Sequence, residues 1–137
     1  MPLIAHLQFG DNDLKVYNRD YMVKDVIIRF KKDYDEFRPV SDPRCESIEL
    51  TVYSPGKTDT NLQQWYINDM VENGRIIMGE ADPANGAVTD WKQIFFSNAH
   101  CFSLGEHYSI DSMRRALTLK FTAEEIEIQE IEFKLNS

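Results

Sequence analysis

Apolar residues in this chain recur at every second position over most of its length, and this spacing limits the possible folds more than any other feature. Successive side chains of a β-strand point to opposite faces, so a period of two predicts strands that each have one buried face. The pattern returns about eight times, and short runs of turn-forming residues separate the repeats. The clearest strands are expected at residues 3–9, 21–30, 45–53, 75–79, 91–102 and 113–121.

The second of these strands carries two detailed expectations. Residues 18–20 (Asn-Arg-Asp) are typical of a turn, so we expect a break in the chain before residue 21. After the break, Met22, Val26, Ile28 and Phe30 lie at even positions and should share one face of the strand.

The last segment changes its parity. Ile126 and Ile128 are at even positions, whereas Ile131, Phe133 and Leu135 are at odd ones. A strand can absorb such a one-residue slip through a bulge or bend near residues 129–130. A short helix that places Ile128, Ile131 and Leu135 on one face is the alternative interpretation.

Residues 60–73 break the β pattern and predict a helix of three to four turns. Leu62, Trp65, Tyr66 and Met70 fall at helical spacing, an oxygen of residue 58, 59 or 60 would cap the helix, and Asn73-Gly74 would end it. Many short strands and one helix indicate a mainly β domain spanning residues 1–137. The expected architecture is a barrel or sandwich with the helix packed on its outside.

Two loops connect these elements. Residues 31–44 (KKDYDEFRPVSDPR) contain four basic and four acidic side chains and are long for a connection inside a compact domain. Long loops of this kind are often functional. Residues 81–89 contain Asp-Pro and Asn-Gly pairs, which are typical of a plain hairpin connection.

The overall charge and the apolar runs exclude several classes of protein. A net charge of -8 and a pI near 4.8 argue against binding to nucleic-acid phosphates, because such binding depends on Lys and Arg. No stretch approaches the roughly 18 apolar residues of a membrane helix, and the start of the chain lacks the features of a secretory signal. Cys45 and Cys101 are expected to be free thiols of a protein made in a reducing compartment.

The sequence offers no convincing catalytic, cofactor or metal site. Residues 54–58 end in Gly-Lys-Thr like a phosphate-binding loop, but Thr51 stands where that loop needs its first glycine. His100 and Cys101 are adjacent on an expected strand, so they would point to opposite faces and could not share an ion. His107 and Glu106 lack a third ligand. The acidic residues after position 123 alternate with isoleucines, as on a solvated strand face.

The order of the segments resembles a known family. Ser-Ile-Glu-Leu-Thr-Val at 47–52 precedes a helix that opens as Asp-x-x-Leu-x-x-Trp (59–65), and Phe-x-x-Ala-x-Cys follows at 96–101. Over residues 22–128 this order is similar to the tube-forming subunit of type VI secretion systems, the hemolysin-coregulated protein (Hcp, or TssD) family, and looks closest to its Bacteroidetes branch. The resemblance implies a β-barrel of two packed antiparallel sheets with one flanking α-helix.

It also implies a structural role without enzymatic activity. Hexameric rings of the subunit would stack into a hollow tube, which a contractile sheath propels and whose lumen can carry effector proteins. The implied partners are copies of this chain and the sheath, baseplate and spike proteins. The subunit would assemble in the cytoplasm and leave without a signal peptide. A specialised paralogue that carries effectors fits the same resemblance.

Several residue roles follow as hypotheses. The first strand and residues 113–121 would lie near exposed sheet edges that join neighbouring subunits, and the helix would brace a subunit junction or its own barrel. Solvent faces carrying Glu49, Thr51, Thr118 and Lys120 would supply a polar lumen. The ring-stacking loop would use Lys31, Lys32, Asp33, Tyr34, Asp35, Glu36, Phe37 and Arg38, and the helix would use Leu62, Trp65, Tyr66 and Met70.

Two functions from other classes remain as alternatives. A monomeric barrel could bind a small apolar ligand in its interior. A hydrolase with an unrecognised site is the other. The particle mass in solution separates a ring from either of them.

Overall fold

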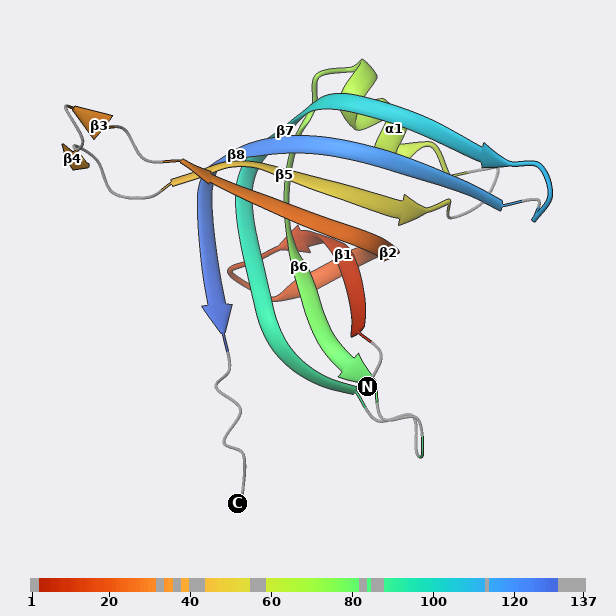
Figure 1. The fold of residues 1–137 in the computed structure, drawn as a ribbon, viewed down its shortest axis with the longest axis horizontal. Helices are drawn as coiled ribbons and strands as arrows, with labels where there is room; N and C mark the ends of the chain where they lie inside the picture. The colour runs from red at the N-terminus through yellow and green to blue at the C-terminus, as the bar shows by residue number, and fades with distance from the viewer. Residues whose placement is uncertain are drawn as a thin grey trace.

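The computed structural model describes residues 3–31, 34–35, 38–39, 44–54, 59–81, 84, 88–112 and 114–130. Its main feature is a closed six-stranded barrel in the order β1-β2-β5-β8-β7-β6, in which β1 also pairs with β6 (Figure 1). All neighbouring strands are antiparallel. The barrel strands are β1 (Leu3–Asp11), β2 (Val16–Lys31), β5 (Arg44–Tyr53), β6 (Val71–Ala81), β7 (Val88–Ser109) and β8 (Arg114–Glu130). The predicted mainly β fold with one flanking helix is confirmed.

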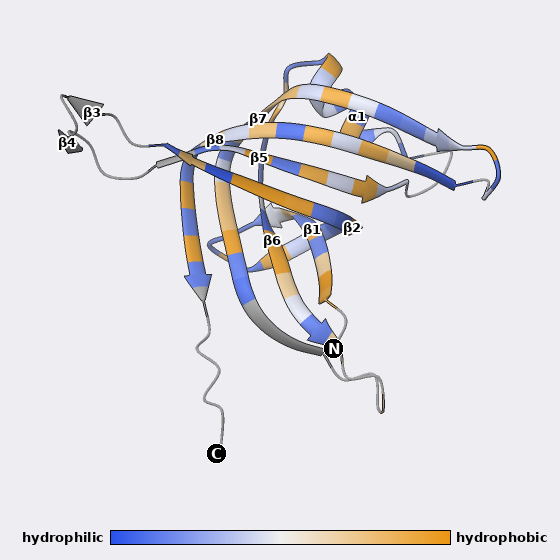
Figure 2. Ribbon diagram, viewed as in Figure 1, coloured by the Kyte–Doolittle hydropathy of each residue, from blue (hydrophilic) through white to orange (hydrophobic). Residues whose placement is uncertain are grey.

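Apolar side chains from every strand fill the interior of the barrel. Hydrophobic and hydrophilic residues alternate along the strands (Figure 2), which places the hydrophobic set inside the barrel and the hydrophilic set outside. Each fully buried large side chain stabilises the fold by about 1.5–3 kcal/mol. The buried set from the strands comprises Leu7, Phe9, Tyr21, Val23, Ile48, Leu50, Val52, Ile76, Ile94, Phe96, Ala99, Cys101, Leu117, Leu119 and Phe121.

The expected turn at residues 18–20 is wrong, because β2 runs through it. The register shifts where Phe9 pairs with Arg19 and Gly10 pairs with Tyr17, so one extra residue of β2 is absorbed as a bulge. The Arg19 guanidinium lies 2.7 Å from the Glu72 carboxylate on β6. Asn18 and Asp20 are exposed on this long strand, whereas the Arg19 guanidinium lies over the buried Phe9 ring, 4.6 Å from its centroid.

The predicted face of β2 is also partly wrong. Met22 is 56% exposed, while Tyr21 and Val23 are buried. A second register shift between Val23 and Asp25 reverses the parity, so that beyond it the even residue Val26 packs against the core. One bulge residue is enough to exchange the two faces of a strand.

The helix α1 (Asn61–Ile67) is shorter than predicted. It ends where Asp69 adopts a left-handed φ of 52°. The Met70 N–H donates to the Trp65 carbonyl at 3.2 Å and the Asp69 N–H donates to the Tyr66 carbonyl at 3.4 Å, the two bonds of a Schellman stop. The predicted stop at Asn73-Gly74 is wrong, since both residues lie in β6. Thr60 is the N-cap residue, although its side chain makes no capping hydrogen bond.

This stop suggests a stabilising substitution. An L-residue in the left-handed region is strained, and glycine removes the strain. Asp69→Gly is expected to raise the free energy of unfolding by about 1 kcal/mol. Asp69→Ala should lower it, because alanine has a Cβ and adopts the left-handed conformation less readily than aspartate does. Urea denaturation of both variants measures the difference. Equal midpoints for glycine and alanine would contradict the stop at Asp69.

The charged connection between β2 and β5 contains a second small sheet. β3 (Tyr34–Asp35) pairs antiparallel with β4 (Arg38–Pro39), and this hairpin projects away from the barrel (Figure 1). Residues 81–89 join the antiparallel neighbours β6 and β7, as a hairpin connection should. At the other end, β8 is a strand up to Glu130, and the expected change of parity beyond it lies outside the described residues.

Candidate assembly surfaces

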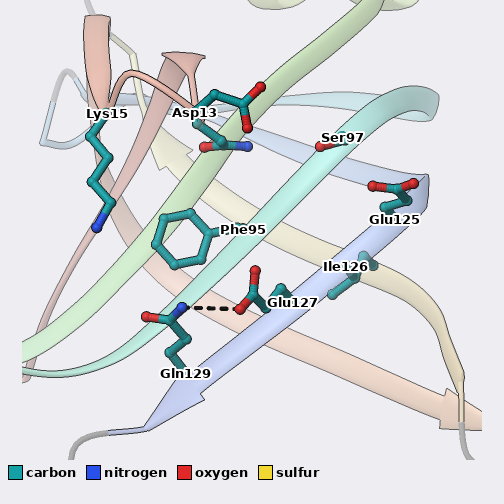
Figure 3. Close-up of a pocket in the computed structure, with 9 residues that line it drawn as sticks. Asp13, Lys15, Phe95, Ser97, Glu125, Ile126, Glu127 and Gln129 are labelled. Atoms are coloured by element: carbon teal, nitrogen blue, oxygen red, sulfur yellow. Dashed lines mark hydrogen bonds between the residues drawn. The ribbon is translucent and has the colours of Figure 1, made fainter.

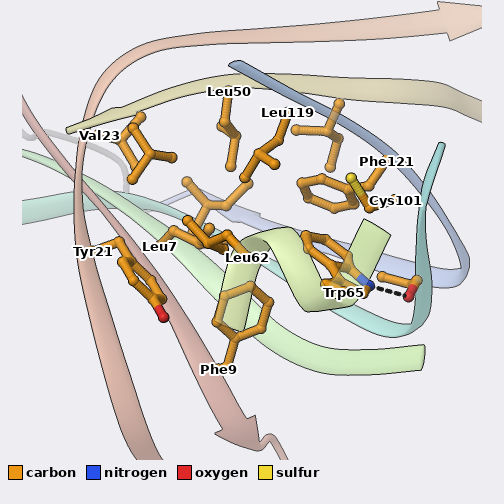
Figure 4. Close-up of a cluster of buried hydrophobic side chains, with 14 of the residues drawn as sticks. Leu7, Phe9, Tyr21, Val23, Leu50, Leu62, Trp65, Cys101, Leu119 and Phe121 are labelled. Carbon is orange, nitrogen blue, oxygen red and sulfur yellow. Dashed lines mark hydrogen bonds between the residues drawn. The ribbon is translucent and has the colours of Figure 1, made fainter. Parts of the chain in front are cut away.

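The helix divides its predicted site residues into two groups. Leu62 and Trp65 are each 1% exposed and lie in the core (Figure 4). The Trp65 ring packs 5.4 Å from Phe9 and 5.3 Å from Phe121, between ring centroids. Its Nε1–H donates to the Ala99 carbonyl on β7 at 3.0 Å. These two residues hold the helix to its own barrel.

The other two predicted helix residues face outward. Tyr66 is 43% exposed and Met70 is 44% exposed. Ile67 and Val71, at 72% and 47%, extend the same apolar run. We call Tyr66, Ile67, Met70 and Val71 the α1 patch. Four exposed apolar side chains within six consecutive residues are typical of an interaction surface.

The predicted stacking loop is described only in part. Lys31 ends β2 and is exposed. Tyr34, Asp35 and Arg38 belong to the β3–β4 hairpin, where Asp35 pairs with Arg38. Lys32, Asp33, Glu36 and Phe37 lie outside the described residues.

The four residues that were predicted to lie on the solvent faces of their strands lie together in the structure. Glu49 pairs directly with Lys120, and Thr51 pairs directly with Thr118, on the outer face of β5 and β8. Arg29 on β2 adds a cation 3.9 Å from the Glu49 carboxylate. We call Glu49, Thr51, Thr118 and Lys120 the polar sheet face. Its charges alternate in sign, so it has little net field.

A shallow recess of about 340 Å³ lies on the other wall of the barrel (Figure 3). The Phe95 ring lies within it, Lys15 comes from the β1–β2 turn, and the carboxylates of Glu125 and Glu127 project from β8. Gln129 Nε2 donates to Glu127 Oε1 at 3.1 Å. The recess has carboxylates and an amide, but neither a nucleophile paired with a base nor a set of metal ligands.

The residues considered for metal binding are held apart. Cys101 is buried at 5% exposure, whereas His100 on the opposite face is half-buried. Burial raises the pKa of the Cys101 thiol, which makes it an inert small apolar residue. In the described ranges, no group of three His, Cys, Asp or Glu side chains could hold a metal ion. Those ranges also contain no helix long and apolar enough to cross a membrane.

The sheet edges differ from the prediction. β1 pairs with β2 and β6, and residues 116–121 of β8 pair with both β5 and β7, so neither predicted edge is free. Strand neighbours instead change along three long strands, β2, β7 and β8, and the pairing of β8 with β5 stops at Phe121. Pairing of β2 with β1 stops at Val23, and pairing of β7 with β6 stops at His100. Alternation in a sequence indicates the faces of a strand and carries no signal for its neighbours.

Comparisons with known proteins agree with this architecture. Hcp1 from Flavobacterium johnsoniae superposes with a TM-score of 0.69 at 22% identity, over 95% of this chain and 98% of that one. Hcp1 from Salmonella typhimurium gives a TM-score of 0.65 at 10% identity, over 96% of this chain and 88% of that one. A chain of the anti-feeding prophage baseplate, solved with six-fold symmetry, gives 0.53 at 8% identity, over 96% and 94%.

At these identities the solved structures establish the fold alone. No curated protein matches the sequence. The model of the hemolysin coregulated protein family, Hcp (TssD), matches residues 10–136, which is nearly the whole chain. This protein therefore belongs to the Hcp (TssD) family, the tube subunits of type VI secretion systems.

Proposed function

We propose that this tube subunit forms hexameric rings, that the rings stack into a hollow tube, and that the tube carries effector proteins in its lumen. Family membership supports the proposal, and the observation that carries it is the α1 patch, whose side chains are 43–72% exposed in the single chain. Burying such residues against a neighbouring copy removes apolar surface from water. A ring needs heterologous contacts, in which one surface of each copy meets a different surface of the next.

Stacking is assigned to the connection between β2 and β5, residues 31–38. Its β3–β4 hairpin projects from the barrel, and charges of both signs can set the register between rings. Sheath, baseplate and spike proteins are the proposed partners of the tube, which would assemble in the cytoplasm and be exported without a signal peptide. The polar sheet face is the proposed lumen wall, because a surface of alternating charge and threonine holds passing cargo weakly.

This function works through shape and not through catalysis. Membership of a family of structural tube proteins supports this proposal. A barrel that binds an apolar ligand in its interior is disfavoured, because buried side chains such as Phe9, Leu50, Phe96 and Phe121 occupy that interior.

Electron microscopy of the concentrated protein tests the proposal. We expect rings with a mass about six times the 16.0 kDa chain, together with stacked tubes. Deleting residues 33–38 should leave the rings intact and abolish the tubes, because the hairpin is lost while the barrel strands remain.

Two outcomes contradict these assignments. A wild-type chain that stays monomeric at every concentration rules out the ring. Tubes of normal length in the deletion variant rule out stacking through this hairpin.

A further inference from the structure

The last part of β8 forms a strand edge on the outside of the barrel. β8 leaves β5 after Phe121 and continues beside β7, so within the described ranges residues 122–130 have a strand neighbour on one side only (Figure 1). This segment is roughly 30 Å long at about 3.3 Å per residue. We call it the β8 edge. An edge of this length carries unpaired N–H and C=O groups that can accept a strand from another polypeptide.

The core holds the β8 edge in place. Ile126 and Ile128 pack against the buried cluster, and they pair with Phe96 and Ile94 of β7, which are fully buried. A segment that is already extended and fixed loses little conformational freedom when it binds a partner. The β8 edge is therefore preorganised for the addition of a strand.

The outward side chains beside this edge are mainly acidic. Glu125 and Glu127 alternate with the inward isoleucines and line the recess together with Phe95 of β7 (Figure 3). Asp13 and Lys15 line the recess from the β1–β2 turn, so three carboxylates surround it against one ammonium group. The β8 edge itself contains no lysine or arginine. An added strand would therefore meet negative charge, and cations at every second position of that strand would complement it.

Hydrogen bonds fix the β1–β2 turn against β7 and so keep the recess open. Asn12 Nδ2 donates to the Phe96 carbonyl at 3.0 Å, and the Tyr17 hydroxyl donates to Asn12 Oδ1 at 2.7 Å. The apolar stem of a lysine or arginine can lie in this hollow against the Phe95 ring while its charge stays near the carboxylates.

We infer that the β8 edge binds an extended segment of a partner protein that carries lysine or arginine at every second position. The segment adds to the sheet as a further strand and places its cations beside Glu125 and Glu127. The unpaired backbone of the edge carries the inference, and the charges of the recess determine the chemistry of the partner. The site is complete in one subunit, so it does not depend on the proposed ring.

A second copy of this chain fits the site poorly through this sheet. Two β8 edges repel each other through their glutamates. At the other end of the sheet, residues 16–22 of β2 pair with β1 alone among the described strands. The Arg19 guanidinium there lies 2.7 Å from the Glu72 carboxylate and over the Phe9 ring, and Asp20 is the exposed charge. Neither end of the sheet in a second copy supplies the alternating cations.

A labelled peptide of alternating lysine and threonine tests the inference. Fluorescence anisotropy should show saturable binding of this peptide to the wild-type chain. The same peptide with proline in place of threonine keeps the charge but cannot pair as a strand, and we expect its affinity to be at least about tenfold lower. A peptide of alternating glutamate and threonine should not bind.

Charge-neutralising variants locate the site. Glu125→Gln combined with Glu127→Gln should weaken binding of the lysine peptide at least about fivefold, because two exposed charge pairs are lost. The matched control is Glu106→Gln with Asp111→Asn, which removes two exposed carboxylates near the β7–β8 turn and should keep the wild-type affinity. Circular dichroism shows whether both variants keep the wild-type fold.

Hydrogen exchange separates strand addition from simple charge attraction. Bound lysine peptide should slow amide exchange in the β8 edge and leave residues 16–22 unchanged. Equal affinities for the lysine and proline peptides, or unchanged exchange in the β8 edge, would overturn strand addition. Unchanged affinity in the Glu125 and Glu127 variant would overturn the assigned site. Protection of the β8 edge by assembly alone, without peptide, would assign it to a second copy and overturn the inference. None of these results bears on whether the wild-type chain forms rings.

Discussion

Trp65→Ala will lower the free energy of unfolding by about 3–5 kcal/mol, the range for truncating a large aromatic residue in a core. Trp65 is only 1% exposed, and its indole ring packs against Phe9 and Phe121. Its loss also leaves the buried carbonyl of Ala99 without the Nε1–H donor. Since domains are stable by only about 5–15 kcal/mol, this change removes a large share of the total. Urea denaturation followed by far-ultraviolet circular dichroism measures it.

The adjacent residue provides the matched control. Tyr66→Ala removes an aromatic ring that is 43% exposed, so the isolated subunit should lose less than about 1 kcal/mol. If the α1 patch closes the ring, Tyr66→Ala should instead weaken assembly. Equal urea midpoints for Trp65→Ala and the wild-type chain would contradict the role of Trp65 in the core.

Gly74→Ala is expected to disrupt the barrel at the contact of β6 with β1. A Cβ at this position would lie 2.1 Å from the Gln8 carbonyl oxygen and 3.0 Å from the Phe96 ring. The first contact is with backbone, which cannot move without breaking the β1–β6 pairing at Phe9 and Gly74. We expect a loss of at least about 3 kcal/mol, the upper range for overpacking, and insoluble expression at 37 °C. Thermal denaturation of the soluble fraction measures the loss.

Gly105→Ala is the control for the chemical change itself. A Cβ there would lie 4.0 Å from Thr118 Cβ, which is ordinary van der Waals contact. This variant should match or slightly exceed the wild-type melting temperature, because alanine restricts the unfolded chain more than glycine does. Equal melting temperatures for the two alanine variants would contradict a close backbone approach at Gly74.

The strands could be predicted from the sequence because the alternation of apolar and polar residues follows directly from the burial of one face. Ile48, Leu50 and Val52 are fully buried, as their spacing predicts. The pattern fails where a bulge shifts the parity. In β7, Phe96 and Ala99 are both buried although their spacing is odd, because Asn98 adopts a φ of 53° and its N–H donates to Asn73 Oδ1 at 2.8 Å. Bulges depend on a partner strand, which a single sequence does not identify.

The helix boundary was misjudged for a related reason. Asn73-Gly74 has the residue types of a helix stop, but the barrel uses that glycine for a close strand contact. Asp69, which does stop the helix, has no such signature in the sequence. Glycine is favoured both at the end of a helix and where two strands approach closely. At Gly74 the packing of the barrel decides which of these two roles the residue has.

The assembly surfaces were predictable only in part. Glu49 and Lys120 share a face because their strands alternate in phase, and the pairing of β5 with β8 confirms this. The points at which β2, β7 and β8 exchange neighbours had no signature in the sequence, because alternation within a strand does not identify its partners. The spacing of Leu62, Trp65 and Tyr66 predicts one shared helix face. In the structure Leu62 and Trp65 are buried, whereas Tyr66 is exposed.

The pairing of β1 with β6 has a consequence for biosynthesis. Leu7 lies opposite Ile76, so β1 is synthesised well before β6, its partner on this side. Contacts between residues distant in sequence slow folding to the range of milliseconds to seconds. During that delay the nascent chain exposes unpaired strands that can aggregate.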